Sequence, residues 1–146
     1  MSGDTPAYET NGAPEAAPGG AETLLLADDA DAVRDVTRRL LQGAGYRVVA
    51  AANGQEAVDL FQRTPGAIDL VVLDAVMPRL SGPAAFAQMR TLRPDLRAVF
   101  LSGYSADVLG PEWLDDGGVE LVMKPVTRAE LLRRVRGALD APPRSS

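Results

Sequence analysis

The chain has 146 residues, of which 46% are hydrophobic and 24% are charged, and its formal net charge is −5. These values are ordinary for one globular domain with a core of its own. The chain contains no Cys and no His. This excludes disulfides, thiolate and imidazole metal sites, catalysis by Ser-His or Cys-His pairs, and a phosphohistidine on this chain.

The two ends of the chain differ in composition from the middle. Residues 1–22 hold four acidic residues and no Lys or Arg, so the rest of the chain has a net charge of −1. This first segment is rich in Gly, Pro and Ala, and Tyr8 is its only large apolar residue. We therefore expect residues 1–22 to form a disordered acidic tail, and residues 141–146 to be a disordered C-terminal end.

The charge and hydropathy of the whole chain also limit its surroundings. A nearly neutral folded part does not favour binding to nucleic acid. No apolar run approaches the length of a membrane span, and the N-terminus lacks the features of a secretory signal. We therefore expect a cytoplasmic protein without membrane insertion.

The first predicted strand is the apolar run of residues 23–27, which ends at Asp28 and Asp29. A helix is predicted over residues 30–42, where apolar residues recur at helical spacing. These residues are Val33, Val36, Leu40 and Leu41.

Residues 46–51 form the second predicted strand. The next helix is expected to begin at Asn53, because Asn53 with Glu56 three residues later is typical of a capping box. That helix ends before Thr64-Pro65-Gly66.

The third predicted strand, residues 70–73, is wholly apolar and runs directly into Asp74. A continuous apolar run of this length is typical of a parallel strand that is buried on both faces. Asp74 would then lie at the carboxyl end of the strand, where open α/β sheets bind ligands. Taken alone, Asp74 could simply begin a turn. The loop contains Pro78, and Gly82 with Pro83 predicts a helix that reaches about Leu92, with Phe86, Met89 and Leu92 on one face.

Two further strands complete the pattern. Residues 97–101 form the fourth and end at Ser102, and residues 119–123 form the fifth and end at Lys124-Pro125. Between them, Gly110-Pro111 interrupts residues 104–117, for which we expect two short turns or a frayed helix. The last helix is predicted to begin at Thr127, which forms a second capping box with Glu130.

The order of these elements defines the fold class. Five strands that alternate with helices predict an α/β domain with a parallel five-stranded sheet covered on both faces. Right-handed crossovers leave few topologies. We predict a flavodoxin-like, doubly wound (βα)5 domain over residues 23–140, with strand order 2-1-3-4-5.

This topology brings the polar residues at the strand ends to one edge of the sheet. They are Asp28, Asp29, Asp74, Ser102 and Lys124. Clustered carboxylates repel one another, and a divalent cation such as Mg²⁺ removes that cost. An aspartate can accept a phosphoryl group, whose charge a lysine and a hydroxyl would stabilise. Taken singly, Ser102 could be a turn residue and Lys124 a solvated surface charge.

These residues, in this order, resemble the receiver domain of two-component response regulators. The resemblance covers residues 23–140 and includes Met77-Pro78, Gly82, Ser102-Gly103-Tyr104 and Lys124-Pro125. The Ser102-Gly103-Tyr104 run is similar to receivers of hybrid histidine kinases. The resemblance implies that the chain accepts a phosphoryl group and switches its partner contacts in response.

The resemblance also implies a role for each site residue. Asp74 would be the phosphoacceptor and, with Asp29, Asp28 through water and the carbonyl of Val76, would hold Mg²⁺. Ser102 and Lys124 would contact the phosphoryl group. Pro78 and Gly82 would have structural roles, and Pro125 would follow a cis peptide bond. The family usually has an aromatic switch residue where this chain has Leu121, and Tyr104 is a possible substitute.

The implied phosphodonor is a phosphohistidine on a histidine kinase or a histidine phosphotransfer protein, and small-molecule phosphodonors are possible. The first helix typically meets that donor. The chain would be no enzyme beyond catalysing its own phosphorylation and dephosphorylation.

Two alternatives stay open at this point. A magnesium-dependent phosphatase of the haloacid dehalogenase kind also uses an Asp nucleophile, but it has Asp-x-Asp on its first strand, where this chain has Asp28-Asp29-Ala30. A pseudo-receiver would bind partners without phosphorylation, and the intact acidic set argues against it.

Overall fold

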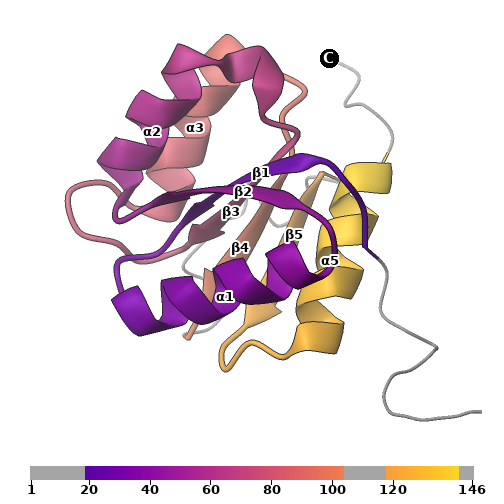
Figure 1. The fold of residues 1–146 in the computed structure, drawn as a ribbon. Helices are drawn as coiled ribbons and strands as arrows, with labels where there is room; N and C mark the ends of the chain where they lie inside the picture. The colour runs from indigo at the N-terminus through magenta and orange to yellow at the C-terminus, as the bar shows by residue number, and fades with distance from the viewer. Residues whose placement is uncertain (1–18, 104–117, 142–146) are drawn as a thin grey trace, which may run out of the picture.

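The computed structural model describes residues 19–103 and 118–141, and the predicted turns of residues 104–117 lie outside these ranges. The described residues form one parallel sheet of five strands in the order β2-β1-β3-β4-β5, which confirms the predicted topology (Figure 1). The strands are β1 (Thr23–Ala27), β2 (Arg47–Ala51), β3 (Leu70–Asp74), β4 (Ala98–Ser102) and β5 (Val119–Met123). The helices are α1 (Asp31–Gly43), α2 (Gly54–Arg63), α3 (Gly82–Leu92) and α5 (Arg128–Asp140), with a short 3-10 helix at Pro65–Ala67.

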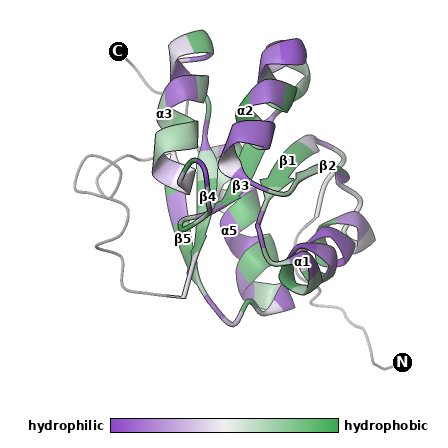
Figure 2. Cartoon of the chain, turned by 90° about the vertical axis from the view of Figure 1, so that its left-hand side faces the viewer, coloured by the Kyte–Doolittle hydropathy of each residue, from purple (hydrophilic) through white to green (hydrophobic). Residues whose placement is uncertain are grey.

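Helices cover both faces of the sheet, as Figure 1 shows, with α2 and α3 on one side and α1 and α5 on the other. Alternate residues of a strand point to opposite faces. In β3, Val71 and Leu73 therefore belong to the core under α2 and α3, whereas Leu70 and Val72 belong to the core under α1 and α5. This two-sided burial explains why the central strands β1, β3 and β4 are almost wholly apolar, whereas the edge strands contain Arg47 and Glu120. Figure 2 shows the hydrophobic colouring of β1.

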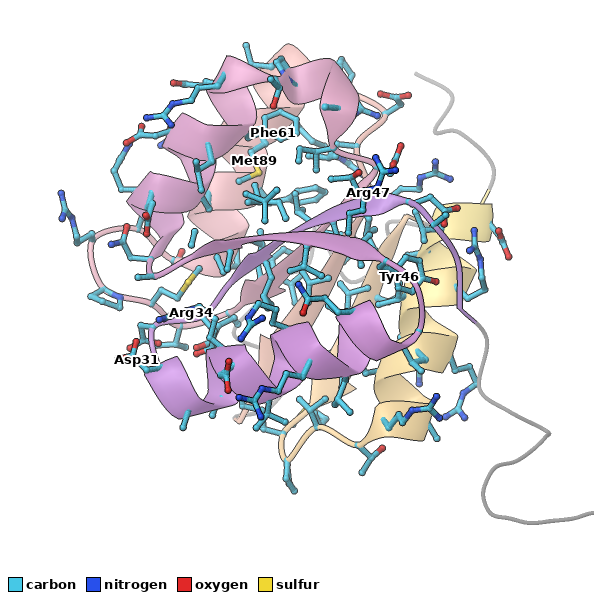
Figure 3. The ribbon with its side chains drawn as sticks, in the orientation of Figure 1. Asp31, Arg34, Tyr46, Arg47, Phe61 and Met89 are labelled. Atoms are coloured by element: carbon cyan, nitrogen blue, oxygen red, sulfur yellow. The ribbon has the colours of Figure 1, made fainter. Side chains whose placement is uncertain are left out.

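The core between the sheet and α2 and α3 contains the three Phe side chains of the protein. Phe86 of α3 packs edge-on against Phe100 of β4, with ring centroids 5.7 Å apart. Phe61 and Met89 also point into this layer (Figure 3). Among the described residues, no helix is both long enough and apolar enough to cross a bilayer.

Two apolar residues that we predicted on buried helix faces are exposed. Val36 is 55% exposed and Leu92 is 47% exposed. The buried side of α1 runs through Thr37 and Leu41, and consecutive helical residues point about 100° apart. Val36 is therefore turned away from the sheet, and Leu92 is at the last position of α3, beyond its buried turn.

The predicted helix starts are confirmed, but the two capping boxes differ from the expected pattern. The Asn53 side chain accepts a hydrogen bond from the Glu56 N–H at 2.8 Å, and Glu56 accepts in return from Ala52 rather than from the cap residue itself. The Thr127 hydroxyl accepts from the Glu130 N–H at 3.3 Å. The Glu130 carboxylate instead forms ion pairs with Arg133 and Arg134. Of the two hydrogen bonds of a capping box, this second box therefore shows the one to the Thr127 hydroxyl.

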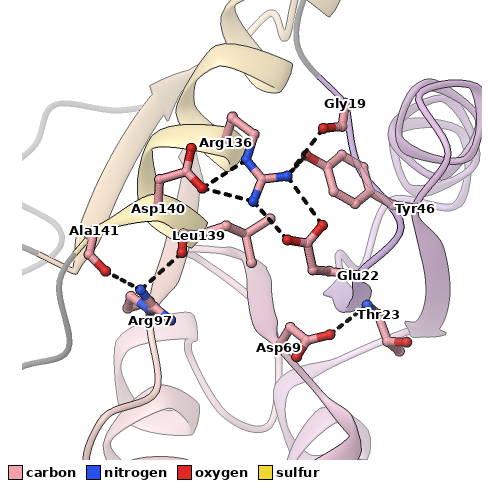
Figure 4. A network of polar contacts seen from close by, with 10 residues as sticks. All are labelled: Gly19, Glu22, Thr23, Tyr46, Asp69, Arg97, Arg136, Leu139, Asp140 and Ala141. Carbon is pink, nitrogen blue, oxygen red and sulfur yellow. Dashed lines mark hydrogen bonds and ion pairs between the residues drawn. The ribbon is translucent and has the colours of Figure 1, made fainter.

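The structured part of the chain begins before residue 23, where we had placed the end of the tail. Arg136 of α5 is the centre of a polar network at the amino-terminal edge of the sheet (Figure 4). Its guanidinium donates to both carboxylate oxygens of Glu22, to the carbonyl of Gly19 and to Asp140. Residues 19–22 are thus held against α5, and only residues 1–18 of the expected tail lie outside the described ranges.

We expect Arg136→Gln to lower the free energy of unfolding by about 1–2 kcal/mol, because it removes charge-assisted hydrogen bonds at a half-buried position. The Arg136 hydrogen bond holds the pKa of Glu22 below its usual value. A lowered carboxyl pKa stabilises the fold above the pKa of the unfolded chain, and this stabilisation is lost as the pH falls through the folded pKa. Urea unfolding of the variant and the wild type should therefore differ at neutral pH and converge in acid. Arg133→Gln, on the exposed side of the same helix, is the control and should change stability by less than about 0.5 kcal/mol.

Candidate functional site

Three acidic residues meet at the carboxyl ends of β1 and β3. These two strands are neighbours, and Ala27 is paired with Leu73. Asp28 therefore lies beside Asp74, which is the last residue of β3. One carboxylate oxygen from each of Asp28, Asp29 and Asp74 lies within 4.8 Å of the others.

Asp28 is fully buried, and its two carboxylate oxygens have different environments. Oδ1 accepts a hydrogen bond from the Ala30 N–H at 2.9 Å. Oδ2 accepts no hydrogen bond from the described residues, and it lies 3.3 Å from the Nζ of Lys124. A buried carboxylate oxygen without a hydrogen bond is costly, so this atom is suited to a cation or an ordered water.

Lys124 lies in the segment between β5 and α5, and its side chain extends to the acidic residues at the ends of β1 and β3. Its Nζ lies 3.3 Å from Asp74 Oδ1 as well as from Asp28. Its backbone N–H donates to the carbonyl of Ser102 at 2.7 Å, and the peptide bond to Pro125 is cis, as the resemblance implied. Lys124 is therefore paired within the site rather than a solvated surface charge.

Ser102 is buried at the end of β4, on the same edge of the sheet. The adjacent residue, Gly103, lines a cavity of about 440 Å³ together with Asp29, Asp74, Val76 and Lys124. Val76 is half exposed at the rim of this cavity. Tyr104, the candidate switch aromatic, lies outside the described residues, while Leu121 is partly buried against the core.

The loop after β3 is folded back tightly on the end of the strand. The Ala75 N–H donates to the Leu101 carbonyl, and the Gly82 N–H donates to the Ala75 carbonyl at 3.1 Å. A Cβ atom at Gly82 would lie closer to the Asp74 backbone oxygen than van der Waals contact allows. The Leu80 N–H donates to the Pro78 carbonyl, which closes the turn between them. Gly82 and Pro78 thus belong to the structure that supports Asp74.

The electrostatics of the site are dominated by burial and carboxylate repulsion. Burial and the nearby charge of Asp28 raise the pKa of Asp74 to about 6, although Lys124 acts in the opposite direction. Burial alone would lower the pKa of Lys124, but its ion pairs with Asp28 and Asp74 raise it above the usual value. Lys124 is therefore charged at neutral pH, and Asp74 is ionised at an energetic cost.

In the absence of divalent cations, we expect Asp74→Asn to stabilise the fold at pH 7 by up to about 3 kcal/mol. A carboxyl pKa that is higher in the folded state means that the native protein binds the proton more tightly than the unfolded chain does. The resulting cost is absent below the unfolded pKa near 4 and is complete above pH 6. Denaturant unfolding from pH 4 to pH 7 should show the advantage of the variant growing with pH. An advantage that stays constant with pH would contradict this assignment.

The donor set fits a hard divalent cation. Mg²⁺ prefers carboxylate and carbonyl oxygens and retains waters that phosphate oxygens can replace. Asp28, Asp29 and Asp74 would supply the carboxylates, and Asp28 Oδ2, whose contact among the described residues is the ion pair with Lys124, has room for a further interaction with such an ion or its waters. The polar residues predicted at the strand ends are therefore brought to one edge of the sheet.

Sequence analysis did not identify one residue that contacts the acidic turn. Arg34 of α1 donates from Nη1 to the Asp28 carbonyl at 2.8 Å. The only signal for it was its position three residues after Asp31, with which it forms an ion pair at 2.6 Å. Such i,i+3 pairs are common on helices, so the pattern alone did not single it out.

A parallel α/β sheet with an acidic cluster and a lysine at its carboxyl edge defines a class of phosphoacceptor-like domains. Comparison with known proteins assigns the chain within that class, because residues 24–136 match the model of the response regulator receiver domain. The chain belongs to this family and is a receiver domain of two-component signalling systems.

The relatives agree with this assignment. The chain is 36% identical over 83% of its length to the sensor kinase CckA of Brucella abortus, of which it spans 13%. The crystal structure of a receiver domain from the hybrid histidine kinase CckA is 34% identical, with a TM-score of 0.69, over 81% of this chain and 99% of that one. The Thermotoga maritima response regulator TrrA, solved in complex with Mg²⁺-BeF, is 31% identical with a TM-score of 0.70, over 80% and 98% of the two chains. The phosphatase and pseudo-receiver alternatives are not favoured by these matches.

Proposed function

We propose that Asp74 accepts a phosphoryl group from a phosphohistidine and that this change switches the contacts of the domain with its partners. The observation that supports the proposal most directly is the placement of a buried carboxylate, Asp74, 3.3 Å from Lys124 at the wall of an open cavity. A carboxylate oxygen of Asp74 would attack phosphorus, the phosphorus–nitrogen bond would break, and the imidazole would leave with the electron pair.

The surrounding residues would supply charge and orientation. Lys124 would pair with a phosphoryl oxygen, and the Ser102 hydroxyl would donate a hydrogen bond to another. Asp28, Asp29, Asp74 and the carbonyl of Val76 would hold Mg²⁺. When bound, the ion would neutralise the charge that the phosphoryl oxygens bring to the acidic cluster. The chain would catalyse only its own phosphorylation and dephosphorylation.

An apolar groove beside the site supports a protein phosphodonor, either a histidine kinase or a histidine phosphotransfer protein. The groove has a volume of about 290 Å³ and lies between α1 and the segment that follows β5. It is lined by Ala32, Val33, Val36, Thr37, Lys124, Pro125 and Val126. The exposed Val36 is explained if this face of α1 is covered by the donor during transfer.

Intact-mass measurement tests the proposal. The full chain, incubated with Mg²⁺ and a small acyl or amido phosphate, should gain the mass of one phosphoryl group. A chelator should prevent that gain. A chain that gains no phosphoryl group at saturating donor and Mg²⁺ would instead be a pseudo-receiver.

We expect the phosphorylated protein to lose its phosphoryl group slowly compared with receivers that carry a polar group at this position, because Val76 at the rim of the cavity has no polar side-chain atom to orient an attacking water. Val76→Asn places an amide at this position and should shorten the lifetime of the phosphoryl group several-fold. Following the decay of the phosphorylated mass after removal of the donor gives both lifetimes. Val49→Asn, an exposed position on β2, is the control. Equal lifetimes for Val76→Asn and the wild type would rule out this role for Val76.

A further inference from the structure

We propose that Arg34 is a positioning residue that shapes the turn between β1 and α1 for cation binding. This inference rests on the proposed function, because it concerns the Mg²⁺ site of Asp28 and Asp29. Arg34 itself would not touch the ion or the phosphoryl group. It would act through the backbone that carries the two carboxylates.

Arg34 holds both ends of the tripeptide Asp28-Asp29-Ala30. Its side-chain Nη1 donates to the carbonyl of Asp28 at 2.8 Å, and its backbone N–H donates to the carbonyl of Ala30 at 2.8 Å. The intervening residue, Asp29, has an exposed side chain that lines the cavity. The Asp28 carbonyl bond depends on the Arg34 side chain, whereas the Ala30 carbonyl bond is the first main-chain bond of α1. The side chain therefore adds a second point of attachment to the backbone that carries the Asp29 carboxylate.

The N-cap position of α1 does not itself stabilise the start of the helix. Its N-cap residue is Ala30, which offers no side-chain hydrogen bond to the first turn. The Asp28 carboxylate accepts the Ala30 N–H at 2.9 Å, so one of the groups that would bind the cation also closes this turn. Without the Arg34 side chain, the Asp28 carboxylate would have to hold the Ala30 N–H and contribute to cation binding at the same time.

The guanidinium has a second partner, the exposed carboxylate of Asp31. Its Nη2 donates to Asp31 at 2.6 Å, and the Arg34 side chain is 22% exposed. Figure 3 shows Asp31 and Arg34 together at the amino-terminal end of α1. The planar guanidinium thus bridges the first residue of the turn and the first residue of the helix, a geometry that a lysine ammonium cannot reproduce with both partners.

Positioning and simple electrostatics predict opposite results when this side chain is changed. Arg34 carries a positive charge near a cation site, so removal of the charge alone would strengthen Mg²⁺ binding. Loss of a group that orients metal ligands weakens binding, by about ten-fold or more. The sign of the change in affinity therefore separates the two explanations.

The test is calorimetric titration of Mg²⁺ into the full chain without phosphodonor. We expect Arg34→Ala to weaken Mg²⁺ binding about ten-fold, and Arg34→Lys to weaken it about three-fold although the charge is kept. The matched control is Arg38→Ala, one turn further along α1. Arg38 pairs with Asp35 in the same i,i+3 arrangement and donates to Gln42, further along the helix, so its variant should bind as the wild type does.

The outcomes are distinguishable. Unchanged binding in Arg34→Lys together with unchanged or tighter binding in Arg34→Ala would overturn the positioning role. Thermal unfolding without Mg²⁺ identifies a variant that has merely lost its fold. If Arg34→Ala is unfolded, the Mg²⁺ affinity of Arg34→Lys decides between the two explanations. A wild-type chain that binds no Mg²⁺ would overturn the proposed function itself.

Discussion

Replacing Asp74 by asparagine is expected to abolish phosphoryl acceptance. The amide has almost the size of the carboxylate but lacks the negatively charged oxygen that would attack phosphorus. Asp74 is only 6% exposed and belongs to the end of β3, so a substitution of equal size leaves the packing intact. Since the variant also removes a charge that is costly to bury, its loss of function cannot be attributed to unfolding.

The measurement is intact mass after incubation with a small phosphodonor and Mg²⁺. The wild type should gain one phosphoryl group and Asp74→Asn none. Asp69→Asn is the matched control, because Asp69 precedes the same strand but accepts from the Thr23 N–H at the opposite end of the sheet. It should be phosphorylated as the wild type is. A phosphoryl group found on Asp74→Asn would assign the acceptor to another residue, and fragmentation of the labelled chain would identify it.

Gly82→Ala is the second change with a large expected effect. A Cβ atom at this position would overlap the backbone oxygen of Asp74 and crowd the Cα of Ala75. Because these are backbone atoms of a buried strand end, they cannot move aside as a flexible side chain would. We expect the free energy of unfolding to fall by about 2–4 kcal/mol, together with a lower rate of phosphorylation, since the crowded atoms include the backbone of the acceptor residue Asp74.

Gly137→Ala is the matched control for that prediction. Gly137 lies on the exposed side of α5, and a Cβ atom there meets nothing within 4 Å. Alanine is favoured over glycine inside a helix, so this variant should be more stable by about 0.5–1 kcal/mol. Chemical denaturation of both variants should therefore give shifts of opposite sign. A Gly82→Ala protein as stable as the wild type would show that the loop after β3 can move away from Asp74.

The site residues that could be predicted from the sequence are those that directly follow a predicted strand. Asp28, Asp74 and Lys124 each come directly after an apolar run, and parallel strands place their carboxyl ends on one edge. The structure confirms that these three side chains meet. Arg34 could not be predicted in this way, because its link to the Asp28 carbonyl depends on how α1 turns away from β1.

Burial on the helices, and on the edge strand β2, was predicted less well than burial in the central strands. In β3 every residue is buried, as a continuous apolar run predicts for a strand that is covered on both faces. In α1 the same kind of evidence was ambiguous, since Val36 is exposed and the polar Thr37 is buried. A helix has one buried side whose direction is set by its neighbours, and the sequence alone does not contain that direction.

The sequence by itself determined the number and order of the strands, their parallel pairing and the residues at their ends. It could do so because the two-residue period and the two-sided core leave a parallel strand little freedom. Only the tertiary structure decided which atoms meet: the Lys124 contact with two carboxylates, the Asp28 oxygen without a hydrogen bond, the Arg34 link and the Arg136 network. These contacts join residues from separate elements, and their geometry depends on helix rotation and loop path, which local sequence patterns do not specify.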